Sequence, residues 1–215
     1  MLAYQRLLQG LRSRVARYAS WMLLALTLNH ADATVLQDLD FPALVSGSRL
    51  IFVGSVQSQR QEVQGNLVLT YVTFSVETTY KGDVTTPTLE LSFVGGQGNT
   101  FNVQVQGQFI PPIGMRAVFF IEKPDRQQVN PLTGWQQGYF PLTKGPDGLD
   151  YLDMRLRPDL AIPGLVVDPL VTKMQGMGFS ADAINAKVPR AYLFSLDDFR
   201  LAVIDELQAQ GAATP

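Results

Sequence analysis

The segment Leu67–Tyr80, LVLTYVTFSVETTY, indicates the fold class because apolar and polar side chains alternate along it. Successive side chains of a β-strand point to opposite faces, so a period of two predicts one long strand with one buried face. The opposite face is largely polar, although it also carries Leu69 and Tyr71. The even positions are Val68, Thr70, Val72, Phe74, Val76 and Tyr80, and the odd positions include Thr73, Ser75, Glu77 and Thr79.

Shorter segments before and after this strand are also typical of β-structure. They are rich in β-branched and aromatic residues, and turn signals separate them. A strand as long as Leu67–Tyr80 bends to serve both sides of a small barrel more readily than it fits a flat sandwich. We therefore predict a mainly β protein built on a small antiparallel β-barrel. The other expected strands are Leu50–Val56 with a bend at Gly54, Leu89–Phe93, Phe101–Val105, a central strand Ala117–Ile121, and a hairpin of Gly138–Thr143 with Leu149–Met154.

Helices are expected at both ends of this β-rich region. A short helix begins near Pro42, with Asp40 as its cap, and stops at Gly47. A capped amphipathic helix is predicted over Ser195–Gln208, and its apolar stripe of Phe199, Val203 and Leu207 should pack on the barrel. Between them, Arg155–Phe194 lacks clear periodicity, and we expect it to wrap the barrel with a short helix near Ala181–Ala186.

Residues 1–33 have the three parts of a cleaved secretory signal peptide. Four arginines and no acidic residue lie in Met1–Arg17, an uncharged apolar run follows at Tyr18–Leu28, and Ala31-Asp32-Ala33 has the form of a cleavage site. The apolar run is shorter than the roughly 20 residues that a spanning helix needs. We therefore expect cleavage between Ala33 and Thr34 and an exported protein, periplasmic or secreted, with no stable membrane anchor. The expected domains are 1–33 as signal peptide, 34–154 as barrel and 155–215 as wrapping segment and helix.

The expected mature chain is mildly acidic. Four of the 17 Lys and Arg and one of the 19 Asp and Glu lie in residues 1–33, which leaves 13 basic against 18 acidic residues. Nucleic acids and anionic membranes require clustered Lys and Arg, so the charge balance argues against both as partners.

The expected mature chain also contains neither histidine nor cysteine. His30 is the only histidine and lies in the signal peptide, and the chain has no cysteine. This composition excludes His-dependent triads, Cys nucleophiles, the common zinc sites and disulfides. We therefore predict no catalytic residue, no cofactor and no metal site. Asp147, Asp150 and Asp153 do not have the spacing of a calcium loop and read as turn residues.

Four short motifs resemble one known family of barrels. They are Ile51–Val56 (IFVGSV), Tyr71–Val76 (YVTFSV), Tyr80-Lys81-Gly82 and Ile113–Phe120 (IGMRAVFF). The pattern looks like the OB-fold barrels of netrin-like and tissue-inhibitor-of-metalloproteinase-like domains, and like exported bacterial proteins of the same layout. The resemblance spans about Arg49–Phe140 and implies an OB-like five-stranded barrel with a binding role.

The inhibitory chemistry of that family is not implied by the resemblance. The eukaryotic inhibitors chelate the zinc of the protease with an amino-terminal cysteine, whereas the expected mature start here is Thr34. The disulfides of that family are also missing. Transfer of the fold is reasonable, and transfer of the function is not.

We predict a non-catalytic binding module outside the cytoplasm, in the manner of a protease inhibitor or an envelope assembly protein. Its partner is expected to be an extracytoplasmic protein or glycan, contacted through a barrel face and the loops near Gln57–Asn66 and Gly95–Asn99. The candidate partner-binding residues are Tyr71, Gly95, Gly96, Gln97, Asn99 and Trp135.

The alternative is a hydrolase that needs neither His nor Cys and uses paired carboxylates. The sequence contains no Gly-x-Ser-x-Gly and no Ser-x-x-Lys motif, so serine mechanisms of those kinds are not indicated. Carboxylate partners can be distant along the chain, so the alternative stays open at this point.

Overall fold

The computed structural model describes residues 37–98, 100–145, 148–158, 160–163, 176–178, 180 and 193–211. The expected signal peptide with the expected cleavage site at Ala33 and Thr34, the candidate Asn99 and the short helix expected at Ala181–Ala186 lie outside the described residues. The elements are α2 (Phe41–Gly47), β1 (Leu50–Gln64), β2 (Leu67–Lys81), β3 (Thr88–Val94), β4 (Gly96–Gln97), β5 (Asn102–Val103), β6 (Arg116–Ile121), the 3-10 helix η1 (Trp135–Gln137), β7 (Tyr139–Lys144), β8 (Asp150–Asp153), β9 (Leu193–Ser195) and α5 (Leu196–Ala209).

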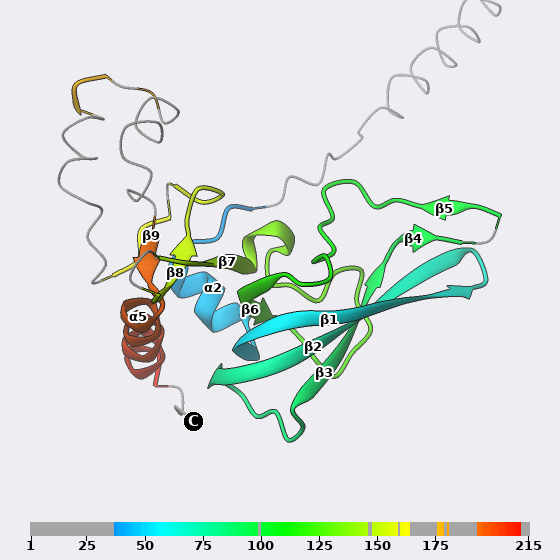
Figure 1. The fold of residues 1–215 in the computed structure, drawn as a ribbon, viewed down its shortest axis with the longest axis horizontal. Helices are drawn as coiled ribbons and strands as arrows, with labels where there is room; N and C mark the ends of the chain where they lie inside the picture. Colours follow the sequence, from blue (N-terminus) through cyan, green and yellow to red (C-terminus); the bar gives the residue numbers. More distant parts are fainter. Residues whose placement is uncertain are drawn as a thin grey trace, which may run out of the picture. The chain divides into compact units, whose positions relative to one another are not determined.

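The main sheet has seven strands in the order β3-β2-β1-β6-β7-β8-β9, and each neighbouring pair is antiparallel. The long strands β1 and β2 run side by side, with β3 next to β2 (Figure 1). Strand β6 pairs with both β1 and β7, which confirms the expected central place of 117–121. Strands β4 and β5 form a separate two-stranded sheet. The prediction of a mainly β protein with an antiparallel sheet and a carboxy-terminal helix is confirmed.

The predicted barrel is not closed. Strands β3 and β9 stand at opposite ends of the strand order, and no pairing between them occurs among the described residues. At the edge of β3 a loop meets the sheet instead of a strand, since Val94 N donates to the carbonyl of Val129 at 2.9 Å. The expected barrel would bury one face of the sheet by curling it, but here both faces of the central strands are apolar. Helices α2 and α5 bury one of these two faces, so the sheet does not have to close into a barrel to bury it.

Helices α2 and α5 cover one face of the sheet. Phe41 of α2 and Phe199 of α5 are both fully buried, with ring centroids 5.8 Å apart in an edge-to-face arrangement. Both predicted caps are present, because Asp40 Oδ1 accepts from Ala43 N at 2.8 Å and Ser195 Oγ accepts from Asp198 N at 3.1 Å. The sheet residues of this core include Ile51, Val53, Val118, Phe120, Phe140 and Leu152.

The other face of the same strands buries a second apolar core. Its centre is a cluster of three phenylalanines, in which Phe74 lies 4.9 Å from Phe119 and 5.7 Å from Phe52 between ring centroids. Alternation along β1 therefore supplies both cores, because Phe52 points to one face and its neighbours Ile51 and Val53 point to the other.

Four details differ from what the sequence predicted. Strand β1 extends to Gln64, so 57–64 is a strand arm paired with β2 and not a loop. The expected strand Phe101–Val105 is reduced to Asn102–Val103, and β9, whose three residues pair with β8, was not expected. Leu69 is fully buried, although it was expected on the largely polar face of the long strand.

The expected bend at Gly54 is present as a register shift between Val53 and Gly54 in the pairing of β1 with β2. A side chain at this position would place its Cβ 2.3 Å from the carbonyl oxygen of Ser75. Only glycine allows this close approach of the two strands.

Candidate functional site

A pocket of about 400 Å³ lies beside the small sheet of β4 and β5. Its walls come from residues 95–97 and 102–105, together with Gln108 and Ile110. Four of these residues are amides, namely Gln97, Asn102, Gln104 and Gln108, and of the described residues that line the pocket none is charged. The pocket therefore presents paired donors and acceptors without an electrostatic preference for a charged ligand.

The end of β3 brings the glycine segment into this pocket. Gly95 N donates to the carbonyl of Val68 at 2.7 Å, and Thr70 Oγ1 donates to the carbonyl of Gly95 at 2.6 Å. Thr70 is buried on β2, so its hydroxyl holds the backbone of Gly95 against that strand. Gly96 has φ 138°, and a Cβ on it would lie 2.7 Å from Thr70 Oγ1. A side chain at Gly96 would therefore collide with the strand beneath the pocket wall.

Gln108 is the most informative residue of the lining. Its Nε2 donates to the carbonyl of Val129 at 3.0 Å, which orients the amide. The Oε1 atom is buried and has no hydrogen-bond partner among the described residues. A buried acceptor without a donor costs about 1–3 kcal/mol, so a rearrangement that brought this oxygen to a donor group of a ligand would be stabilising.

The structure brings three of the predicted site residues together, because Gly95, Gly96 and Gln97 all line the pocket. The sequence interpretation missed Asn102, Gln104 and Gln108. A signal was available, since amides alternate with Phe101, Val103 and Val105 in the sequence. Alternation of this kind places the amides on one face of an extended segment.

Tyr71 lies outside this pocket. It is on β2 opposite Arg60 of β1, and the Arg60 Cζ atom stands 3.7 Å from the centroid of the tyrosine ring. Arg60 Nη2 also pairs with Glu90 of β3 at 2.8 Å, and Gln64 Nε2 donates to the Tyr71 hydroxyl at 3.3 Å. The guanidinium of Arg60 therefore covers one face of the Tyr71 ring, and Glu90 of β3 holds that guanidinium in place.

Trp135 does not line the pocket either, but η1, the 3-10 helix that contains it, contacts the segment just before Gln108. The next residue, Gln136, donates from Nε2 to the carbonyl of Gly107 at 2.8 Å, immediately before Gln108. Trp135 has φ 60°, the left-handed region, which is costly for a residue with a Cβ. No other described residue except glycine has a positive φ.

Two arginines each bring two described carboxylates together. Arg60 pairs with Glu62 and Glu90, which are exposed, and Arg116 is shared by Glu77 and Asp150. Arg116 Nη2 lies 2.7 Å from Glu77 Oε2, and Nη1 lies 2.8 Å from Asp150 Oδ1. The hydrogen bond from Arg116 lowers the pKa of Glu77. Burial opposes ionisation of Asp150, but hydrogen bonds from Lys144 and Arg116 outweigh it and lower its pKa. Both groups are therefore ionised at neutral pH, and neither is suited to act as a general acid.

Over the described ranges, no three His, Asp or Glu side chains come close enough together to hold a metal ion. The helices in those ranges include none with the length and apolar character of a membrane span. Comparison of the chain with protein-family models, curated proteins and solved structures finds no match.

Proposed function

We propose that the chain is an exported, non-catalytic binding module that engages a protein or glycan partner at the amide-lined pocket beside β4 and β5. The observation that carries the proposal is the composition of this pocket. Among the described residues, four amides and no charged side chain line the walls, and none donates to the buried Gln108 Oε1. Sugar hydroxyls and main-chain amides both supply neutral donors and acceptors of the kind that such walls can pair.

The two carboxylates around Arg116, Glu77 and Asp150, support binding over hydrolysis. Glycosidases need one carboxyl group that is protonated at working pH, and its pKa must be raised for that. The pKa of Glu77 is lowered by its hydrogen bonds from Arg116, and Lys144 together with Arg116 lowers the pKa of Asp150 against the effect of burial. Loss of a hydrolytic activity in Glu77→Gln or Asp150→Asn, with the fold retained, would refute the non-catalytic assignment.

The OB-like resemblance is retained as a proposal for the first part of the sheet. The strand order β3-β2-β1-β6, with β1 paired on both sides, supports it, because OB-folds are small and partly open barrels. Such folds use the loops that connect their strands for binding, and the pocket lies in the connection from β3 to β6.

A pair of neighbouring glutamines tests the pocket. Gln104 and Gln106 are both exposed, but only Gln104 lines the pocket. We expect Gln104→Glu to reduce the amount of partner recovered from an envelope extract on immobilised protein, because it places a charge among neutral hydrogen-bonding groups. Gln106→Glu should recover as much as the original chain. Equal recovery by both variants would refute the pocket as the binding site.

The export of the protein is tested separately, by the mass of its mature form. The A-x-A pattern that ends at Ala33 predicts a mature protein that starts at Thr34. The intact mass of the protein from the extracytoplasmic fraction should correspond to residues 34–215. A major product that retains the amino-terminal arginines would contradict it.

A further inference from the structure

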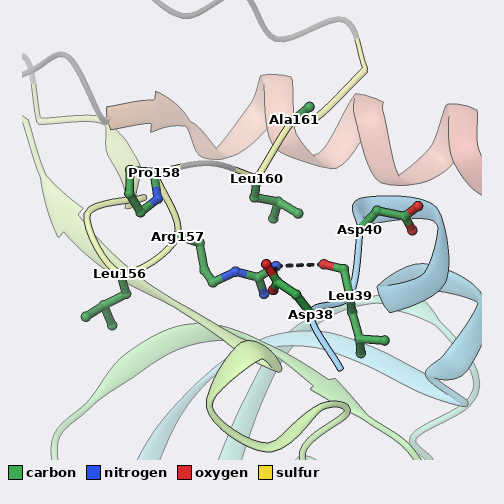
Figure 2. Close-up of a pocket in the computed structure, with 8 residues that line it drawn as sticks. All are labelled: Asp38, Leu39, Asp40, Leu156, Arg157, Pro158, Leu160 and Ala161. Carbon is green, nitrogen blue, oxygen red and sulfur yellow. Dashed lines mark hydrogen bonds and ion pairs between the residues drawn. The ribbon is translucent and has the colours of Figure 1, made fainter. Parts of the chain in front are cut away.

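A second pocket, of about 470 Å³, lies on the side of the sheet that carries α2. Its lining is mixed. Leu39 and Leu160 are among its apolar residues, and it also holds the guanidinium of Arg157 and the side chains of Asp38 and Asp40 (Figure 2). A volume of this size accommodates a small organic molecule. The pocket is formed by different residues from those of the amide-lined pocket, so it represents a separate candidate site.

Arg157 is held in this position by its own backbone and by one of its nitrogens. Its N–H donates to the carbonyl of Met154 at 2.9 Å, and its carbonyl accepts from Leu160 N at 3.2 Å. The Nη2 atom donates to the carbonyl of Leu39 at 2.6 Å, as the dashed line in Figure 2 marks. These contacts fix the guanidinium between the segment before α2 and the segment after β8.

The other half of the guanidinium is not paired. The Nη1 atom is buried and has no acceptor among the described residues, although only 14% of the Arg157 side chain is exposed. The charge is therefore partly desolvated, and burial lowers the pKa of Arg157. A largely buried cation with an unused N–H group attracts an acceptor that carries negative charge.

The only carboxylate near the guanidinium, within the described part of the chain, holds it weakly. Asp38 Oδ1 lies 3.3 Å from Nη2, and 87% of the Asp38 side chain is exposed. Asp40 also lines the pocket, but its Oδ1 accepts from Ala43 N as the cap of α2. Asp38 is thus free to turn into solvent at little cost, whereas Asp40 is engaged.

We propose that this pocket binds a small organic carboxylate with an apolar body, and that the carboxylate of the ligand replaces that of Asp38 at the guanidinium of Arg157. A guanidinium and a carboxylate are both planar and can form two parallel hydrogen bonds with each other. Asp38 makes only one contact with the guanidinium, at 3.3 Å. The leucine walls receive the apolar body of the ligand. Asp38 acts as an internal competitor, because it occupies the place of the ligand's carboxylate.

Hexanoate is a suitable probe, with acetate and inorganic phosphate as comparisons, titrated into the purified protein by calorimetry or NMR. We expect saturable binding of hexanoate with a Kd on the order of 1 mM, and weaker binding of acetate and phosphate. Arg157→Gln should weaken hexanoate at least about tenfold, because a charge-assisted hydrogen bond is lost. Asp38→Asn should tighten it by about two- to fivefold, because a competing charge is removed.

Arg155→Gln is the matched control, since Arg155 is exposed, pairs with Asp153 and does not line the pocket. Its affinity for hexanoate should equal that of the original chain. If Arg157→Gln does not fold, Asp38→Asn still tests the proposal. It keeps the hydrogen bond from Arg157 to the carbonyl of Leu39, so the guanidinium stays in place. Unchanged affinity in Asp38→Asn, or the absence of saturable hexanoate binding, would overturn the proposal. Equal binding of phosphate and hexanoate would overturn the assignment of an apolar ligand.

Discussion

Arg116 on β6 reaches across β1 to Glu77 on β2, where its Nη2 lies 2.7 Å from Glu77 Oε2. The strand between them presents Ser55, whose Oγ donates to Glu77 Oε1 at 3.0 Å. A small residue on β1 is what allows the two long side chains to meet over it. The same arginine holds Asp150 of β8, so one side chain joins strands from distant parts of the sheet.

This network predicts a pH-dependent part of the stability. The pKa values of Glu77 and Asp150 are lowered in the folded protein, so their contribution is present above the ordinary carboxyl range, about pH 4, and is lost as the pH falls through the lowered values. Arg116→Met should cost about 1–2 kcal/mol at pH 7 and flatten the loss of stability below about pH 4. Urea unfolding at a series of pH values measures both effects.

Arg60→Met is the comparison for that experiment, because Arg60 also pairs with carboxylates but is exposed to solvent. Its effect on stability should be smaller and should disappear at high salt. If Arg116→Met had the same acid profile as the original chain, the network would contribute nothing to acid stability.

The docking of α5 is tested at Phe199. Its ring is fully buried and lies 5.4 Å from that of Phe140 and 5.8 Å from that of Phe41 between centroids. Phe199→Ala should lower the free energy of unfolding by about 3–5 kcal/mol. Leu201→Ala on the same helix should cost far less, because 58% of Leu201 is exposed. Equal losses would mean that α5 is not docked through this face.

Gly96 should tolerate substitution less than Gly65. Both have positive φ, but a Cβ on Gly96 would lie 2.7 Å from Thr70 Oγ1, whereas a Cβ on Gly65 has no atom within 4 Å. Gly65→Ala should cost about 1 kcal/mol, from backbone strain alone. Gly96→Ala adds the collision and should cost clearly more by thermal unfolding. A smaller loss at Gly96 would contradict the close approach of the pocket wall to β2.

The left-handed backbone at Trp135 predicts an inverted order of two substitutions. Because φ is 60° there, Trp135→Gly should be more stable than Trp135→Ala by about 1 kcal/mol, although both lose the ring. At Leu201, within α5, the order should be the usual one, with alanine more stable than glycine by about 0.5–1 kcal/mol. Unfolding of the four variants in urea compares the two positions directly, and the usual order at Trp135 would contradict the positive φ.

The sequence by itself determined the local structure of this protein. The period of two in Leu67–Tyr80 corresponds to β2, and the caps Asp40 and Ser195 begin the helices where they were expected. These signals are local, because strand alternation and helix capping depend on residues a few positions apart. The exclusion of His and Cys chemistry in the expected mature chain also follows from composition alone.

Only the tertiary structure decided how the sheet ends and where the pockets lie. The sequence predicted a small antiparallel barrel, but the pairing of β8 with β9 extends the sheet, and α2 and α5 bury one of its faces. That choice depends on contacts between residues far apart in the chain, which periodicity does not encode. The unpaired Oε1 of Gln108 and Nη1 of Arg157 likewise emerge only when distant segments pack, because burial and hydrogen bonding are properties of the assembled fold.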